Sequence, residues 1–228
     1  MKGVIKMSRH IHLSKGNGKI GNCINYSLIP GSKPLMLKDG RVLTKCKGTC
    51  HGCSKGCEDK CYAVNYLKRY HNTCVPAYED NTILARKEPD VFFGELMEAL
   101  ARSTCNVVRP HVAGEFFSKD YMHRTLKLAQ DMPNKEFYFY TKRFSWLEEM
   151  VDEIPKNCHP NVSIWHKNYE NPLGFAEFIY DDGTEPDVSV LPHCPAVNAQ
   201  GKETGITCEK CGLCIRAEKG SRIAVYAH

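Results

Sequence analysis

Thirteen cysteines are the feature of this 228-residue sequence that most restricts how it can fold. Nine of them fall into two runs, one of five between residues 46 and 61 and one of four between residues 194 and 214. The N-terminus lacks the apolar stretch of an export signal, so we expect a cytoplasmic protein with reduced thiols. Clustered thiols in a reducing compartment bind metal more often than they pair as disulfides. An odd cysteine count points the same way.

Length and composition indicate a single globular unit that needs no disulfides to fold. The chain is 42% hydrophobic and 25% charged, as is usual for globular proteins of this size. No stretch approaches 18 consecutive apolar residues, so we expect no membrane partner. The net charge of +5 is mild. Basic residues in the first 20 positions are read as a solvated tail, and a nucleic-acid contact there is the less favoured alternative.

Strands and helices are predicted to alternate from residue 76 onwards, which indicates an α/β fold with a parallel sheet. Strands are expected at 106–114, 136–141 and 161–166, with shorter ones at 176–180 and 188–191. Helices are expected at 76–86, from an N-cap at Asp90, at 118–130 with Ser118 as cap, and at 145–151 with Ser145 as cap. Residues 14–48 are rich in Gly, Ser, Asn and Lys, and only a turn at 29–34 is predicted there.

Ligands of parallel sheets bind at the carboxyl ends of the strands. These ends form the candidate rim of the site. The residues expected there are Gly114, Glu115, Thr141, Lys142, Arg143, His166 and Lys167. We expect one compact unit, with an α/β body over residues 1–193 and a C-terminal cysteine-rich extension over residues 194–228.

The first cysteine run can hold a four-iron cluster in two ways. Cys46, Cys50 and Cys53 form C-x3-C-x2-C, whereas Cys50, Cys57 and Cys61 form C-x6-C-x3-C. Either triplet supplies three thiolates to a [4Fe-4S] cluster and leaves one iron open for substrate or S-adenosylmethionine. Thiolates also suit zinc, and four of the five could close a tetrahedral zinc site.

The second run resembles a ferredoxin ligand run. Cys208, Cys211 and Cys214 follow C-x2-C-x2-C, with Cys194-Pro as a remote fourth ligand. Four thiolates would saturate a [4Fe-4S] cluster, so we expect a closed cluster that transfers electrons or staples the fold. Of the other cysteines, Cys105 and Cys158 are expected to be small buried hydrophobes. The candidates for a third cluster are Cys23, Cys46, Cys53 and Cys74.

Several motifs in order resemble those of the phage gene-product-88 family. Residues 49–63 resemble its cysteine motif ending in C-x3-C-Y-A, and residues 108–118 resemble F-R-x-H-V-S-G-D-F-x-S. Residues 137–143 resemble F-Y-x-Y-T-(K/R), and residues 208–214 resemble the terminal C-x2-C-x2-C. The resemblance runs roughly from residue 14 to residue 228. That family in turn resembles the radical S-adenosylmethionine superfamily.

The resemblance implies a partial (β/α) barrel of parallel strands with its open cluster on Cys50, Cys57 and Cys61, although the superfamily spacing would select Cys46, Cys50 and Cys53. Tyr62 would then stack on adenine, because the aromatic residue usual before the last ligand is absent. Gly114 and Glu115 would bind the methionine amino group, and a plain strand-to-helix turn is the other reading of this pair. The candidates for orienting substrate are His111, Glu115, Lys142, Arg143 and His166.

The sequence therefore leaves three functions open. The first is an oxygen-sensitive radical S-adenosylmethionine enzyme with an open and a closed cluster, supplied with electrons by a ferredoxin or flavodoxin. The second is a non-radical electron carrier or redox sensor on the same scaffold, with every cluster closed by protein ligands. The third is a zinc-bound module that binds nucleic acid through its basic N-terminus.

Overall fold

A seven-stranded sheet forms the centre of the computed structural model, which describes residues 9–165, 171–181, 186–200 and 202–226. The strands lie side by side in chain order, β2 to β7 run parallel, and β1 is antiparallel to β2. The α/β class with a mainly parallel sheet is thus confirmed. The strands are β1 (Ser14–Asn17), β2 (Gly21–Tyr26), β3 (Val107–Pro110), β4 (Glu136–Thr141), β5 (Cys158–Ile164), β6 (Ala176–Asp181) and β7 (Arg222–Tyr226).

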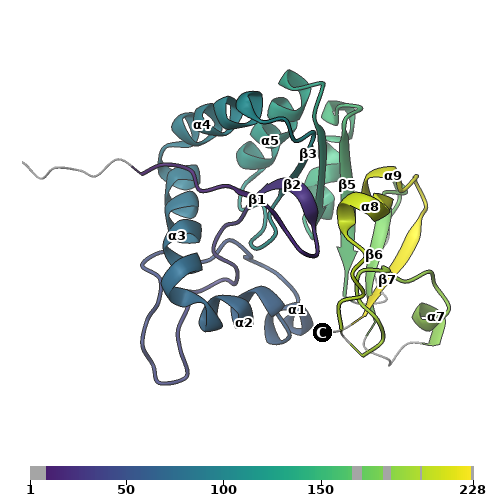
Figure 1. Ribbon diagram of the computed structural model, residues 1–228, viewed down its shortest axis with the longest axis horizontal. Helices are drawn as coiled ribbons and strands as arrows, with labels where there is room; N and C mark the ends of the chain where they lie inside the picture. The colour runs from purple at the N-terminus through teal and green to yellow at the C-terminus, as the bar shows by residue number, and fades with distance from the viewer. Residues whose placement is uncertain (1–8, 166–170, 182–185, 201, 227–228) are drawn as a thin grey trace, which may run out of the picture.

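Helices lie on both sides of this sheet, with α3, α4 and α5 on one side and the short α8 and α9 on the other (Figure 1). None of the helices in the described ranges is long and apolar enough to span a membrane. The helices are α1 (Lys55–Asp59), α2 (Tyr62–Arg69), α3 (His71–Lys87), α4 (Pro89–Arg102), α5 (Lys119–Asp131), α6 (Phe144–Glu149), α7 (Pro186–Ser189), α8 (Cys208–Cys211) and α9 (Leu213–Arg216), with a 3-10 turn at Val151–Glu153.

The two faces of the sheet differ in chemistry, because side chains alternate along a strand. In β4, Phe137 and Phe139 point into the large apolar core under α4 and α5. Tyr138 and Tyr140 point to the opposite face, where they meet Cys214 and Ile215 of α9. The second face therefore carries polar and sulfur groups, and the C-terminal helices cover it.

Several predicted elements are confirmed. Strand 136–141 is β4, strand 176–180 is β6, and the helix expected from Ser118 is α5. The Ser118 hydroxyl caps α5 by accepting a hydrogen bond from the Tyr121 amide at 3.1 Å. The strand at 161–166 begins earlier, at Cys158.

Other predictions were wrong in detail. The strand at 106–114 covers only Val107–Pro110, because the chain turns at His111, which has a φ of 59°. The strand at 188–191 is instead the end of α7, which starts at a proline as helices often do. The helix at 76–86 starts at His71, and neither Asp90 nor Ser145 is a cap, since α4 begins at Pro89 and α6 at Phe144.

Three strands were missed, β1, β2 and β7, and the last two change the topology. Strand β2 lies in the segment for which only a turn was predicted, and it is the first of the parallel strands. Strand β7 belongs to the C-terminal extension and pairs with β6. The extension also returns to the start of β2, where the amides of Cys208 and Glu209 donate to the carbonyls of Lys19 and Ile20 at 2.9 and 3.0 Å. Residues 194–226 are thereby tied to both ends of the sheet.

Candidate functional site

The first cysteine run lies on a loop that follows β2 and is fixed by its own backbone. The Thr49 amide donates to the Ile29 carbonyl at 2.8 Å, and the Cys50 amide donates to the Gly31 carbonyl at 2.9 Å. Gly48 permits this approach, because a Cβ there would lie 2.2 Å from the Gly31 oxygen. The loop is therefore held at the carboxyl end of the first parallel strand, where a parallel sheet binds its ligands.

Four thiols of this run share one neighbourhood around the Lys142 ammonium group. They are Cys50, Cys53, Cys57 and Cys61. Burial, with smaller contributions from Glu115 and Cys61, raises the pKa of Cys50 to about 12. Burial likewise raises the pKa of Cys53 and of Cys57. The nearby Cys61 raises both pKa values as well, and the positive charge of Lys142 lowers both. All thirteen cysteines are free thiols.

Cys46 lies apart from these four thiols. Its side chain packs against the small apolar cluster of Ile29, Leu35, Leu67 and Val75. Burial and the nearby Glu79 carboxylate raise its pKa to about 11. The geometry therefore favours the triplet Cys50, Cys57 and Cys61 over the one that includes Cys46.

Glu115 joins the ends of β3 and β4 beside this site. Its buried carboxylate accepts hydrogen bonds from the Thr141 hydroxyl and from the amides of Phe116 and Lys142, each at 2.8 Å. Burial lowers the pKa of Lys142, but Cys57 and Glu115 outweigh burial and raise it overall. Glu115 and Lys142 place opposite charges near the thiols, and the cofactor contact expected of Glu115 stays a prediction.

Gly114 allows the β3 turn to press against the cysteine loop. Its φ is +93°, and a Cβ there would lie 2.8 Å from Leu28 Cβ and 2.9 Å from Thr49 Oγ1. That same Thr49 oxygen accepts a hydrogen bond from the Glu115 amide at 2.9 Å. A plain strand-to-helix turn would not need this close approach, so Gly114 serves the contact between loop and sheet.

Gly114→Ala is expected to lower the free energy of unfolding by about 1–3 kcal/mol, because a side chain is strained at this φ and collides with two neighbours. Gly94→Ala is the matched control. Gly94 lies inside α4 with nothing within 4 Å of an added Cβ, so alanine should stabilise the helix by about 0.5–1 kcal/mol. Urea unfolding followed by circular dichroism measures both. Equal stability of the two variants would contradict this assignment.

The remaining candidate site residues lie in different places. Tyr62 begins α2 directly after Cys61, is 47% exposed, and donates its hydroxyl to the Val112 carbonyl. Arg143 is held by a hydrogen bond from its Nε to the Phe116 carbonyl at 2.9 Å. His111 is not on the rim: it is 5% exposed, and its ring packs against Tyr26, Phe116 and Tyr121 in the core. His166 and Lys167 lie outside the described residues.

The second cysteine run encloses a hollow of about 20 Å³. Its lining residues are Phe178, Cys194, Pro195, Ala196, Cys208, Cys211, Leu213 and Cys214. Burial raises the pKa of Cys214 to about 12. The Tyr140 hydroxyl donates a hydrogen bond to Cys214 Sγ at 2.6 Å, and this bond partly offsets the rise in pKa. The pKa of Cys208 is also raised, by burial first, with Cys194 and Cys211 adding to the effect. The four predicted ligands are thus brought together.

Arg109 lies beside this second group and was not predicted. Its guanidinium lies 5.1 Å from the ring of Tyr140 and 5.8 Å from the ring of Tyr138, and its charge opposes the raised pKa of Cys208. Its buried Nε has no acceptor among the described residues. An unsatisfied cationic donor beside four thiols fits a group with negative charge and sulfur acceptors, such as a thiolate-bound iron–sulfur cluster. The motif at residues 108–118 was the signal that could have identified it.

The four cysteines proposed for a third cluster are not gathered. Cys53 belongs to the first group, while Cys23 is buried beside the second, near Tyr138 and Cys214. Cys46 and Cys74 both pack on the small apolar cluster. Cys105 and Cys158 are buried in the main core, as expected.

Neither thiol group has the arrangement of a single-ion site in the part of the chain that the structure describes. Zinc draws four sulfurs to within about 4 Å of one another. Within the described ranges, no set of three or more His, Cys, Asp and Glu side chains is arranged to hold one metal ion.

One family model, described as Gene product 88, matches residues 11–217. The match includes both cysteine runs and the strands between them. No curated protein and no solved structure matches the chain.

Proposed function

The chain belongs to the Gene product 88 family, and we propose that it is an iron–sulfur protein with two [4Fe-4S] clusters that acts as a radical S-adenosylmethionine enzyme. Cys50, Cys57 and Cys61 would hold the open cluster. The ligands of the closed cluster would be Cys194, Cys208, Cys211 and Cys214. The observation that carries the proposal is the gathering of free thiols into two groups, each with a cation beside it: Lys142 and Arg109.

The topology supports a partial (β/α) barrel. Six parallel strands follow one another in chain order without the reversal that marks a doubly wound sheet. Right-handed crossovers between strands in such an order lie on one face, which favours curling of the sheet toward a barrel. The cysteine loop follows the first parallel strand and Gly114-Glu115 follows the second, so both lie at the ends where barrel enzymes bind ligands.

An open four-iron cluster supplies the electron for reductive cleavage of S-adenosylmethionine. The chain's own residues would position that cofactor. Glu115 still has lone pairs free after its three hydrogen bonds, so it can accept from an ammonium group. The partly exposed ring of Tyr62 is fixed beside Cys61 and can stack on a base. Lys142 offsets the negative charge of the thiolates.

Iron content tests the two ligand sets. Protein purified without oxygen should contain about eight irons, and Cys57→Ala and Cys208→Ala should each contain about four, because each loses one cluster. Cys74→Ala is the matched control and should keep about eight, since Cys74 lies in the small apolar cluster. Adding S-adenosylmethionine should change the EPR signal of the reduced protein, with dithionite releasing 5′-deoxyadenosine. Iron-free protein, or an unchanged signal, would remove the basis of the proposal.

A non-radical iron–sulfur protein is the second candidate, favoured by the position of Cys53. Its thiol lies with those of Cys57 and Cys61, so it could serve as a fourth ligand and close the first cluster. Cys53→Ala separates the two functions. With an open cluster the variant keeps its iron and its response to S-adenosylmethionine; with a closed one it loses iron or gains that response. Colourless protein with zinc in place of iron would favour the zinc-bound module.

A further inference from the structure

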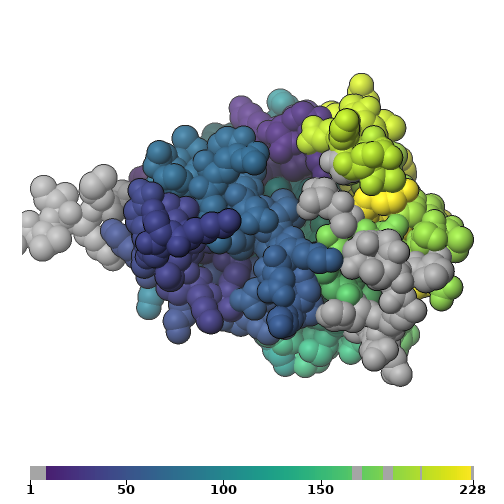
Figure 2. All heavy atoms as spheres, turned by 90° about the horizontal axis from the view of Figure 1, so that it is seen from below, coloured from purple at the N-terminus to yellow at the C-terminus, as the bar shows by residue number. Residues whose placement is uncertain are grey.

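The positive charge of the chain is concentrated in one segment. Residues 33–71 contain nine lysines and arginines but three acidic residues, so this segment alone exceeds the net charge of +5 of the whole chain. The segment comprises the loop before the cysteines, α1 and α2, and Figure 2 shows it spread across the face seen from below. A field of one sign on one face attracts an oppositely charged partner.

Three exposed tyrosines belong to α2 and its C-cap. Tyr62, Tyr66 and Tyr70 are spaced four residues apart, which places them along one stripe of the helix. They are 47%, 47% and 46% exposed, and no other large aromatic side chain of the described residues is as open to solvent. The rings of Tyr66 and Tyr70 lie 4.7 Å apart at 46°. We call these residues the tyrosine stripe.

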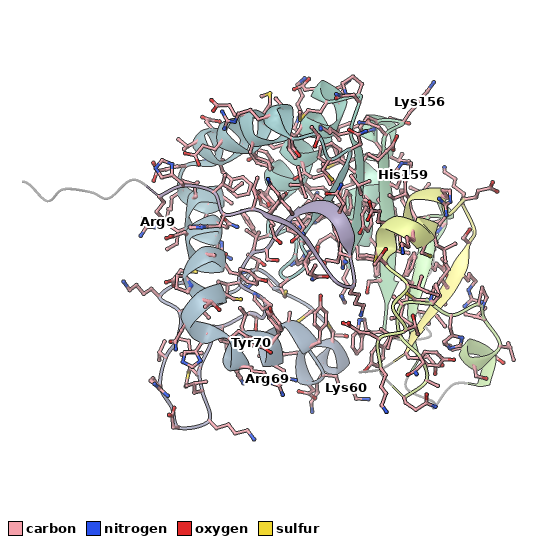
Figure 3. The ribbon with its side chains drawn as sticks, in the orientation of Figure 1. Arg9, Lys60, Arg69, Tyr70, Lys156 and His159 are labelled. Carbon is pink, nitrogen blue, oxygen red and sulfur yellow. The ribbon has the colours of Figure 1, made fainter. Side chains whose placement is uncertain are left out.

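A hollow lies against α2, the helix that carries the tyrosine stripe. Its volume is 570 Å³, in the range of ligand sites, and it opens to solvent. Its lining residues are Leu37, Lys38, Asp39, Asn65, Lys68 and Arg69. Three cations against one carboxylate make it suited to phosphate groups. Figure 3 shows Lys60, Arg69 and Tyr70 along the same lower edge of the molecule.

We propose that the tyrosine stripe and this hollow bind single-stranded nucleic acid. Bases stack on the exposed rings and phosphates lie on Lys38, Lys68 and Arg69, the combination found in proteins that bind single strands. A duplex would hide its bases from the rings, and an acidic protein would meet the cations without needing a row of open aromatic faces. Tyr62 follows Cys61 directly, so the stripe ends at the first cysteine group. The proposal goes beyond the cluster chemistry and does not depend on it.

Fluorescence anisotropy with labelled oligo(dT) and oligo(U) of about 15 nucleotides tests this proposal on protein purified without oxygen. Binding to both should weaken steeply with salt. Tyr66→Ala combined with Tyr70→Ala should weaken it about tenfold or more through lost stacking. Lys68→Ala combined with Arg69→Ala should reduce the slope of log affinity against log salt by about 1.4, since each of the two lost phosphate contacts on a single strand contributes about 0.7.

Met97→Ala combined with Arg102→Ala is the matched control, because both side chains are exposed on α4, away from the stripe. It should bind as the wild type does. Circular dichroism verifies that each variant is folded. Absence of binding at low salt overturns the proposal. So does equal binding by the tyrosine variant, which would leave non-specific charge as the cause. Binding of an acidic flavodoxin in place of the oligonucleotides would reassign this face to a protein partner.

Discussion

Replacing Glu115 with alanine is expected to lower the free energy of unfolding by about 3–5 kcal/mol. The carboxylate is 6% exposed and accepts three hydrogen bonds that join the β3 turn to the end of β4. Its removal leaves the Thr141 hydroxyl and two buried amides without an acceptor. It also removes a negative charge that favours the protonated form of Lys142.

Glu115→Gln and Glu58→Ala complete the test, with urea unfolding of all variants at equal iron content. Glutamine keeps the shape and one acceptor oxygen, so it should lose less stability than alanine does. Glu58 lies on α1, is exposed and accepts a hydrogen bond from the Ser32 hydroxyl, so its removal should change stability by about 0.5 kcal/mol or less. If Glu115→Ala unfolded at the wild-type midpoint, the carboxylate would be held for a ligand and not for the fold.

Local sequence patterns identified β4, whose aromatic residues fill the strand, and α5, which has a serine cap. Strand β4 reads Glu-Phe-Tyr-Phe-Tyr-Thr, and a serine stands at the start of α5. Strand β2 was missed because its second face is polar although it is buried. Asn25 is 7% exposed there, and its side-chain amide donates to the Cys23 carbonyl at 3.1 Å. A buried asparagine whose amide is satisfied by the backbone looks like loop sequence until its partner is known.

Cysteine spacing identified the two groups but could not say which thiols meet. The amide of Cys46 donates to the Glu79 carboxylate at 3.1 Å, across 33 residues, which anchors this cysteine near α3. Ser54 caps α1 by accepting from the Cys57 amide at 3.3 Å, so the loop turns at that point. The first of these contacts depends on tertiary structure, so spacing alone could not decide between the triplet that includes Cys46 and the one that ends at Cys61.

Arg109 and His111, at the end of β3, also show what sequence alone could not predict: their side chains lie on opposite faces of the sheet. Both stand in the motif at residues 108–118, and both are polar. Arg109 points to the cysteine face, where its Nε has no acceptor in the described ranges. His111 has a φ of 59°, which turns its ring into the aromatic core. No sequence pattern distinguishes these orientations, because the turn that reverses His111 lies beyond the strand.

Lowering the pH from 7 to 4 is expected to reduce the free energy of unfolding by about 3 kcal/mol through the titration of His111 alone. Burial lowers the pKa of this histidine to about 3. Its Nε2 lies 3.0 Å from the Tyr121 hydroxyl, and its buried Nδ1 has no partner among the described residues. An unfolded histidine titrates near pH 6.5. Between about pH 6.5 and pH 3 the unfolded chain therefore binds a proton that the folded chain does not, so stability falls as the pH falls.

Urea unfolding of the wild type and His111→Asn at pH 7, 6, 5 and 4 isolates this effect. Asparagine accepts the positive φ better than most residues, so the turn should be kept. The variant should be less stable at pH 7, because a smaller side chain leaves a cavity, yet its stability should fall by about 3 kcal/mol less on going to pH 4. Acid loss of iron would act on both proteins alike. Parallel pH curves for wild type and His111→Asn would mean that this ring takes up its proton in the folded core, which two aromatic neighbours and an unpartnered nitrogen argue against.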